Sequence, residues 1–386
     1  MRGAVIKWLA GGAALGVVAL VALWWSCRET HPEMERPSPA APPVFNPASQ
    51  THHRLSPVEA RSGLADLLPS AVANLKAAET ADQKGATLSH LRQALTGVST
   101  NEASALIRRF LDTRADAPTG RGFKIGGQGI LAESPTLRAF LLDYLGQVDP
   151  AAAALYARTI LSSADSPDEW AVALRNLARG DASPEAKALL EAKTAELLRN
   201  EAWQQDPSVG YLEAFDTAVH LGGTNLLPAL SDLVRKKDNP AVAHAAFLTL
   251  DRLTINQPAE MLAALAQHPE WMTGREETRA NYFARADVSD AEQRRLVEAY
   301  LLDATRSPAE LRAFAGVFPN ANYLVSHNLL TEVATPDGTS LARRDQAALQ
   351  AVNQWLADPR FEKVKPALLK MQARLAEFTR QAGPPN

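Results

Sequence analysis

Pairs of a polar residue followed by proline recur through the middle of the chain, each before a run of apolar residues at helical spacing. The pairs are Ser134-Pro135, Asp149-Pro150, Ser166-Pro167, Ser183-Pro184, Asp206-Pro207 and Asn239-Pro240. A short polar side chain caps a helix, and proline is tolerated at the first helical position. The first separations are 15, 17 and 17 residues, so two helices take about 34 residues, the scale of a solenoid repeat. The pattern predicts an all-α fold of stacked antiparallel helix pairs.

Two of the predicted helix starts also fit a capping box, in which a glutamate three residues after the cap bonds back to the cap's backbone N–H. These are Ser166 with Glu169 and Ser307 with Glu310. We therefore expect both glutamates to serve the ends of their own helices.

Residues 225–254 form the clearest predicted helix pair. In the first helix Leu226, Leu227, Leu230, Leu233 and Val234 share one face, and Arg235, Lys236 and Lys237 make a solvated turn. The inner face of the second helix holds Val242, Ala245, Ala246, Thr249, Leu250 and Leu253. One such pair cannot bury its apolar face alone, so neighbours of the same kind are expected.

This helix pair resembles a HEAT repeat. The resemblance is carried by Pro228, by the turn Asp238-Asn239-Pro240, and by the series Val242, Ala245, Ala246 and Leu250. It departs from the family at Ala243, where HEAT repeats often carry an arginine of their turn-to-helix polar ladder. The resemblance implies an α-solenoid, most often a binding scaffold, and no particular chemistry.

The N-terminal segment has the features of a membrane anchor. Trp8 to Trp25 is 18 residues without a charge and follows Arg2 and Lys7, which predicts a single span with its N-terminus in the cytoplasm. Cleavage as a signal peptide and lipidation at Cys27 are the alternatives. Gly12 and Gly16 have the spacing of a helix-dimer contact, although small residues also simply fill apolar segments.

The predicted organisation is then an anchor over residues 1–27, a proline-rich linker over 28–55, and a helical-repeat domain over 56–386 on the extracytoplasmic, periplasmic side. Such a linker is extended and would hold the domain away from the membrane surface.

A glycine-rich insertion at residues 116–133 interrupts the helical pattern. A loop of this kind can hold phosphate through its backbone N–H groups. Its spacing, however, matches neither a dinucleotide fingerprint nor a P-loop, and we favour a structural loop or short hairpin. If the chain has a discrete site, this loop is the first candidate. The candidate partner-binding residues are Gly120, Gly122, Phe123, Lys124, Gly126 and Gly127, together with the basic turn Arg235, Lys236 and Lys237.

Composition and motifs narrow the function. The sequence lacks a His-Glu-x-x-His motif, a Cys-x-x-Cys pair and a nucleophile elbow, so we predict no catalytic residue, metal or cofactor. A net charge of −3 over 386 residues argues against nucleic-acid binding by bulk electrostatics. We expect a membrane-tethered helical-repeat scaffold that binds a protein or peptide. The alternative is a cell-envelope enzyme with its site at residues 120–129.

Overall fold

The computed structural model describes residues 57–163, 166–322, 328–333 and 337–382. The predicted anchor and linker, with Gly12, Gly16 and Cys27, lie outside these residues. Among the described residues, no helix combines the length and the apolar character needed to cross a membrane.

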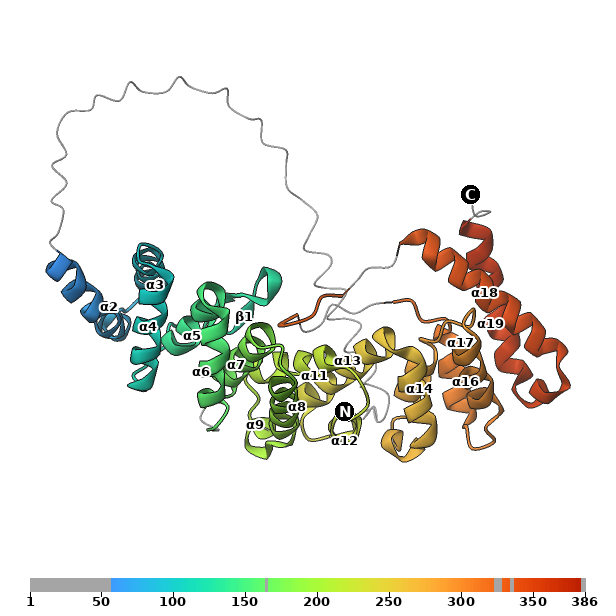
Figure 1. The fold of residues 1–386 in the computed structure, drawn as a ribbon. Helices are drawn as coiled ribbons and strands as arrows, with labels where there is room; N and C mark the ends of the chain where they lie inside the picture. The colour runs from blue at the N-terminus through green and yellow to red at the C-terminus, as the bar shows by residue number, and fades with distance from the viewer. Residues whose placement is uncertain (1–56, 164–165, 323–327, 334–336, 383–386) are drawn as a thin grey trace, which may run out of the picture. The chain divides into compact units, whose positions relative to one another are not determined.

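Over the described residues the fold is all-α apart from one small sheet within the glycine-rich insertion (Figure 1). The N-terminal elements are α2 (Pro57–Ala77), α3 (Ala81–Thr96), α4 (Thr100–Asp112), β1 (Lys124–Ile125), η1 (Gly127–Gly129) and β2 (Leu131–Glu133). The central helices are α5 (Leu137–Val148), α6 (Pro150–Ile160), α7 (Pro167–Gly180), α8 (Pro184–Arg199), α9 (Glu201–Gln205), α10 (Val209–Glu213), α11 (Asp216–Leu221), α12 (Leu227–Arg235) and α13 (Pro240–Asn256). The C-terminal helices are α14 (Pro258–Gln267), η2 (Pro269–Met272), α15 (Glu276–Phe283), α16 (Ala291–Leu302), α17 (Pro308–Val317), α18 (Gly338–Ala357), η3 (Pro359–Val364) and α19 (Lys365–Ala382).

Most of the predicted helix starts are confirmed. The side chains of Asp149, Ser166, Ser183 and Asn239 each accept a hydrogen bond from the backbone N–H three residues ahead, and proline follows each cap. This bond satisfies one of the donors that the first turn of a helix leaves without a partner.

The other two polar-proline pairs were wrongly assigned as caps. Helix α5 is capped by Thr136, whose side chain accepts the N–H of Ala139, while the carbonyl of Ser134 accepts the Thr119 hydroxyl at the base of the insertion. Helix α10 is capped by Ser208, two residues beyond Asp206.

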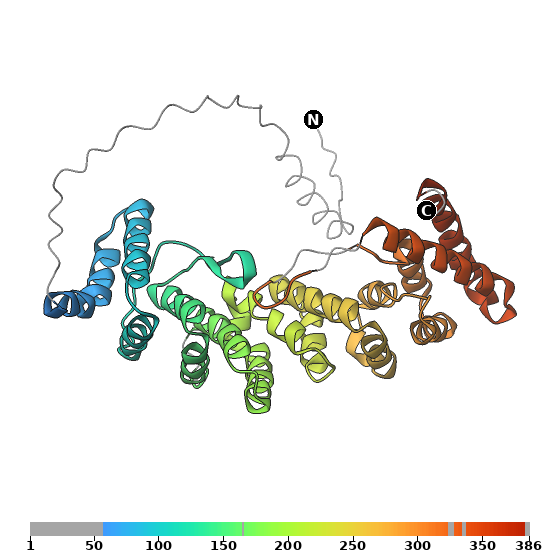
Figure 2. The same ribbon diagram turned by 45° about the horizontal axis from the view of Figure 1, so that its top comes forward.

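The predicted helix pair at residues 225–254 is present as α12 and α13, which pack on each other. All of the residues predicted for its inner faces are buried. Elsewhere too, helices that are neighbours in the chain are neighbours in space: α5 packs on α6, α6 on α7, and α18 on α19 (Figure 2).

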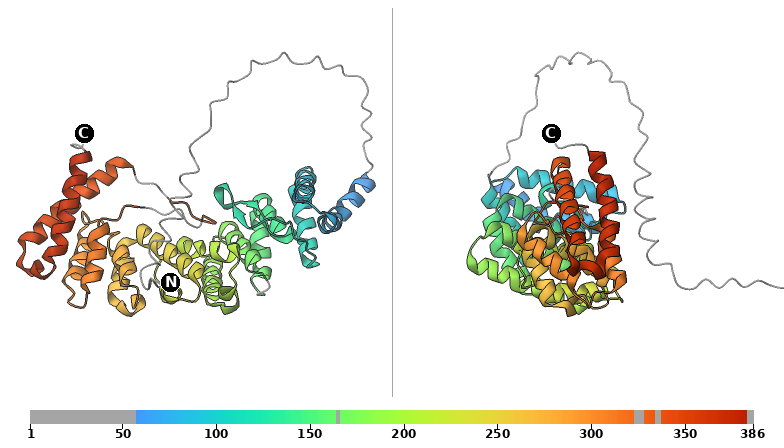
Figure 3. Two further views of the ribbon diagram at one scale, coloured as in Figure 1. Left: turned by 180° about the vertical axis from the view of Figure 1, so that it is seen from behind. Right: turned by 90° about the vertical axis from the view of Figure 1, so that its right-hand side faces the viewer.

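A second set of contacts links alternate helices, because α5 packs on α7, α11 on α13 and α13 on α15. The apolar core is therefore continuous from Leu68 to Leu375. At the C-terminal end α19 lies along α18 (Figure 3) and buries Leu368, Met371 and Leu375.

Both capping-box predictions fail in the same way. Ser166 and Ser307 do cap their helices, but Glu169 forms a two-bond pair with Arg138 and Glu310 one with Arg279. Each arginine lies 31 residues earlier in the chain. A charge-assisted, two-bond pair is stronger than a bond to a backbone N–H, so the tertiary contact prevails.

Three more buried pairs join an acidic residue on one helix to an arginine on or just after a later helix. They are Asp143 with Arg175, Asp216 with Arg252, and Asp251 with Arg285, at separations of 32, 36 and 34 residues. These separations match the predicted repeat length.

Candidate partner-binding groove

The glycine-rich insertion begins and ends against the start of α5. The N–H of Leu137 donates to the Ala117 carbonyl at 2.9 Å, and the N–H of Thr119 donates to the Pro135 carbonyl at 3.0 Å. Between these anchors β1 and β2 pair in antiparallel fashion, so the expected short hairpin is confirmed. The insertion is fixed to the helical frame at its base.

Close backbone approaches explain two of the glycines. Gly129 has φ +66°, and a Cβ there would lie 2.1 Å from the Leu329 carbonyl oxygen. Gly120 has φ +73° and lies against the Lys84 side chain. Because residues other than glycine rarely adopt a positive φ, both positions require glycine. By contrast, a Cβ at Gly122 or Gly127 would meet open space.

The tip of the hairpin is tied to α7 by two arginines. Arg175 Nη1 donates to the Gly129 carbonyl at 2.6 Å, and Arg179 Nη2 donates to the Gln128 carbonyl at 2.7 Å. Two amides of the insertion are also engaged within the protein: the N–H of Gly126 donates to Ile130, and that of Leu131 donates to Asp143. A phosphate cradle needs several N–H groups directed at one anion, and these two amides are not available for it.

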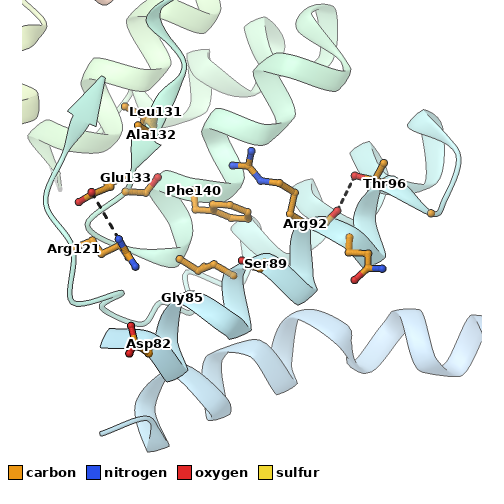
Figure 4. Close-up of a pocket in the computed structure, with 14 residues that line it drawn as sticks. Asp82, Gly85, Ser89, Arg92, Thr96, Arg121, Leu131, Ala132, Glu133 and Phe140 are labelled. Atoms are coloured by element: carbon orange, nitrogen blue, oxygen red, sulfur yellow. Dashed lines mark hydrogen bonds and ion pairs between the residues drawn. The ribbon is translucent and has the colours of Figure 1, made fainter. Parts of the chain in front are cut away.

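An open groove of about 960 Å³ lies between α3, the hairpin and α5. Figure 4 shows its walls, with α3 on one side and β2 on the other. It is lined by Asp82, Gly85, Leu88, Ser89, Arg92, Gln93, Thr96 and Gly97 from α3 and its end, and by Arg121, Leu131, Ala132, Glu133, Ser134 and Phe140.

The groove combines balanced charge with an aromatic platform. Arg121 pairs with Glu133 at 3.7 Å, and the Arg92 guanidinium lies 5.3 Å from the centroid of the Phe140 ring. The lining holds two arginines and two acids, Asp82 and Glu133. An arginine over an aromatic ring keeps its planar donors available to a ligand.

The predicted loop residues do not line the groove themselves. Phe123 is buried in the core, and Lys124 lies 4.0 Å from Glu133 at the rim. The remaining candidates, Gly120, Gly122, Gly126 and Gly127, shape the hairpin that carries Arg121 and β2.

The basic turn belongs to a different part of the molecule. Lys236 and Lys237 line a smaller hollow of about 390 Å³ with Phe247 and Arg275. Arg235 is not in this lining; it pairs with Asp232 in its own helix. The structure therefore does not bring the two sets of predicted residues together.

The polar side chains of the groove are those of arginine, aspartate, glutamate, serine, threonine and glutamine. Its lining contains neither histidine nor cysteine. Across the part of the chain that the structure describes, no group of three or more His, Cys, Asp or Glu side chains could hold a metal ion. No model of a known protein family matches the sequence, and a search of curated proteins found no similar one.

Sequence reasoning missed the residues of α3 that form half of the groove, among them Ser89, Arg92 and Gln93. The available signal was weak: these polar residues lie opposite the buried Leu91 and Leu95 on an amphipathic helix. An exposed polar face becomes a groove wall only when another element lies across from it, and the chain alone does not show which element does.

Proposed function

We propose that the helical unit is a HEAT-like α-solenoid and that the chain is a membrane-tethered scaffold, which binds an extended stretch of a partner protein in the groove between α3 and the hairpin. The observation that carries this proposal is an open, charge-balanced groove with exposed polar walls on a frame held by buried ion pairs.

The solenoid assignment is supported by the periodic arginine–carboxylate pairs. Asp143–Arg175, Asp216–Arg252 and Asp251–Arg285 each join residues that are about one repeat apart in the chain. Stacked repeats contact mainly their neighbours, and ion pairs between residues one repeat apart are consistent with such a stack. These pairs form a polar ladder despite Ala243, the position at which the HEAT resemblance fails.

The class of partner follows from the groove's charge and its openness. Nucleic acid is bound mainly by clustered cations, and here Arg92 and Arg121 are matched by Asp82 and Glu133. A peptide offers both signs of charge as well as main-chain donors and acceptors. The groove's mixture of Ser89, Gln93 and the Arg92–Phe140 platform suits such a ligand.

Membrane attachment is supported by the sequence of residues 1–27, whose uncharged stretch has the length of a short span. The enzyme alternative has less support, because the hairpin tip that suggested it directs its carbonyls to Arg175 and Arg179.

Site-specific photo-crosslinking in cells tests the binding proposal. A photoreactive amino acid at Ser89, in the groove, is expected to give a discrete cross-linked partner, whereas the same amino acid at Leu155 is expected to give none. Leu155 is a matched control because it is 65% exposed on α6, outside the groove. Arg92→Glu is expected to reduce the Ser89 cross-link.

Equal cross-linking from both positions, or none from Ser89, would overturn the proposal. The anchor is tested separately by alkaline extraction of membranes. The full chain is expected to stay in the membrane fraction and a variant lacking residues 1–27 to leave it. Release of both would refute the tether and leave the groove proposal standing.

A further inference from the structure

Residues 328–333 are held on the central helices although they follow α17 in the chain. The buried carboxylate of Asp216, the first residue of α11, accepts the N–H of Leu330 at 2.6 Å and the N–H of Thr331 at 2.8 Å. The same carboxylate accepts the Thr331 hydroxyl. Arg252 of α13 donates to Asp216 at 3.2 Å and to the Thr331 hydroxyl oxygen at 2.5 Å.

A second anchor lies one residue earlier. The Leu329 side chain is fully buried, and its carbonyl accepts a hydrogen bond from Arg179 Nη2 at 3.2 Å. Gly129 at the hairpin tip lies directly against this carbonyl. The segment therefore lies beside both the hairpin and α13, as Figure 2 shows.

These contacts are of the kind with which a protein recognises a bound peptide. Asp216 and Arg179 form hydrogen bonds with main-chain groups, which a peptide of any sequence supplies. The sequence-specific contacts are those of the Leu329 side chain and the Thr331 hydroxyl. Leu330 is half-buried, and Glu332 is exposed. Main-chain bonds give affinity and alternate side chains give specificity in peptide recognition of this kind.

The covered carboxylate supports the same interpretation. Burial raises the pKa of Asp216 above its usual value, against the lowering effect of the Thr331 and Leu330 hydrogen bonds. A desolvated carboxylate is costly unless donors satisfy it. Here the donors are the backbone N–H groups of Leu330 and Thr331, the Thr331 hydroxyl and the Arg252 guanidinium.

We propose that Arg179, Asp216 and Arg252 form a second binding site, distinct from the groove, for a peptide segment of the pattern Leu-x-Thr or Leu-x-Ser. Residues 328–333 are its internal ligand, and a partner segment of the same chemistry takes their place. This inference does not depend on the function proposed for the groove.

Competition from the internal ligand sets the design of the test. A tethered segment acts at an effective concentration on the order of millimolar, so a free peptide binds the unaltered protein weakly. Replacing Thr331 by alanine removes the hydroxyl that Asp216 and Arg252 hold, and weakens the internal ligand while leaving the site itself unchanged.

The probe is a fluorescent synthetic peptide with the sequence of residues 328–333, and its anisotropy is measured with the full chain in mild detergent. We expect Thr331→Ala to bind the peptide at least tenfold more tightly than the unaltered chain. Adding Asp216→Asn to Thr331→Ala is expected to cancel this gain. A peptide with alanine in place of its threonine should lose most of its affinity.

An equal affinity for the unaltered chain and Thr331→Ala would overturn the proposal, and so would binding that Asp216→Asn does not change. Hydrogen exchange gives an independent readout. The amides of Leu330 and Thr331 are expected to exchange by local opening, well before the α7 amides of the same sample. Exchange of both only on global unfolding would show that the segment is a fixed part of the fold.

Discussion

Removing the carboxylate of Asp143 should be among the most destabilising single changes in this protein. Asp143 and its partner Arg175 are 1% and 2% exposed, with 2.5 Å between Oδ1 and Nη1. Asp143 also accepts the N–H of Leu131 at 3.1 Å and the amide of Gln147 at 2.7 Å. In Asp143→Ala the Arg175 charge stays buried without its counter-charge, and breaking a buried pair in this way costs about 3–5 kcal/mol.

The double variant Asp143→Leu/Arg175→Met distinguishes the cost of an unpaired buried charge from the cost of losing the ion pair itself. Replacing both partners by apolar side chains removes the unpaired charge, and such swaps are often neutral or stabilising. Here the double variant also loses the Arg175 bond to the Gly129 carbonyl, which adds about 1 kcal/mol of loss. We therefore expect the double variant to be more stable than Asp143→Ala.

The assay is hydrogen exchange of α5 and α7 as a function of urea, which reports the free energy of opening of these helices. Glu362→Ala is a matched control, since it removes a surface pair with Lys365 at 3.1 Å and should cost less than about 0.5 kcal/mol. If the double variant loses as much as the sum of its two single variants, the pair is not coupled and the reasoning is refuted.

Two further predictions concern the hairpin tip and acid stability. Gly129→Ala places a Cβ on a residue with left-handed backbone conformation, beside the Leu329 carbonyl. It should lower the free energy of unfolding by about 1–2 kcal/mol from the backbone alone and speed hydrogen exchange of the Leu330 amide. Gly127→Ala, where the Cβ meets open space, should change neither. Hydrogen bonds from Ser183, with the Arg158 pair, lower the pKa of Asp181 from 3.8 to about 2, so its contribution to stability should be complete above pH 4 and lost between about 4 and 2. NMR titration of the Asp181 carboxyl checks this, and a pKa that Arg158→Gln leaves unchanged would contradict it.

Local chemistry explains what the sequence could predict. The caps at Asp149, Ser183 and Asn239 depend on groups within three residues, so a short window contains everything that decides them. Glu169 and Glu310 were predicted wrongly because their arginines lie 31 residues away, where a local motif has no information.

The candidate sites needed tertiary information for the same reason. Arg92 and Phe140 meet only because α3 and α5 lie beside the hairpin. Leu330 lies 114 residues after Asp216 in the chain, so nothing local pairs the two. One usable signal was present. An acid and an arginine, each within or next to an apolar helical run, recur at separations of 32, 36 and 34 residues, close to the repeat length given by the caps.

The hairpin connects the two proposed sites through buried groups. Leu131 lines the groove, and its N–H donates to Asp143. Asp143 pairs with Arg175, which in turn donates to the carbonyl of Gly129. Gly129 lies beside Leu329. Ligands at two sites influence each other only if they favour different arrangements of what lies between them. A hairpin anchored at its base by α5 and at its tip by α7 has little freedom to take a second arrangement. The structure thus favours two peptide sites that act independently, one open and one filled by the chain itself.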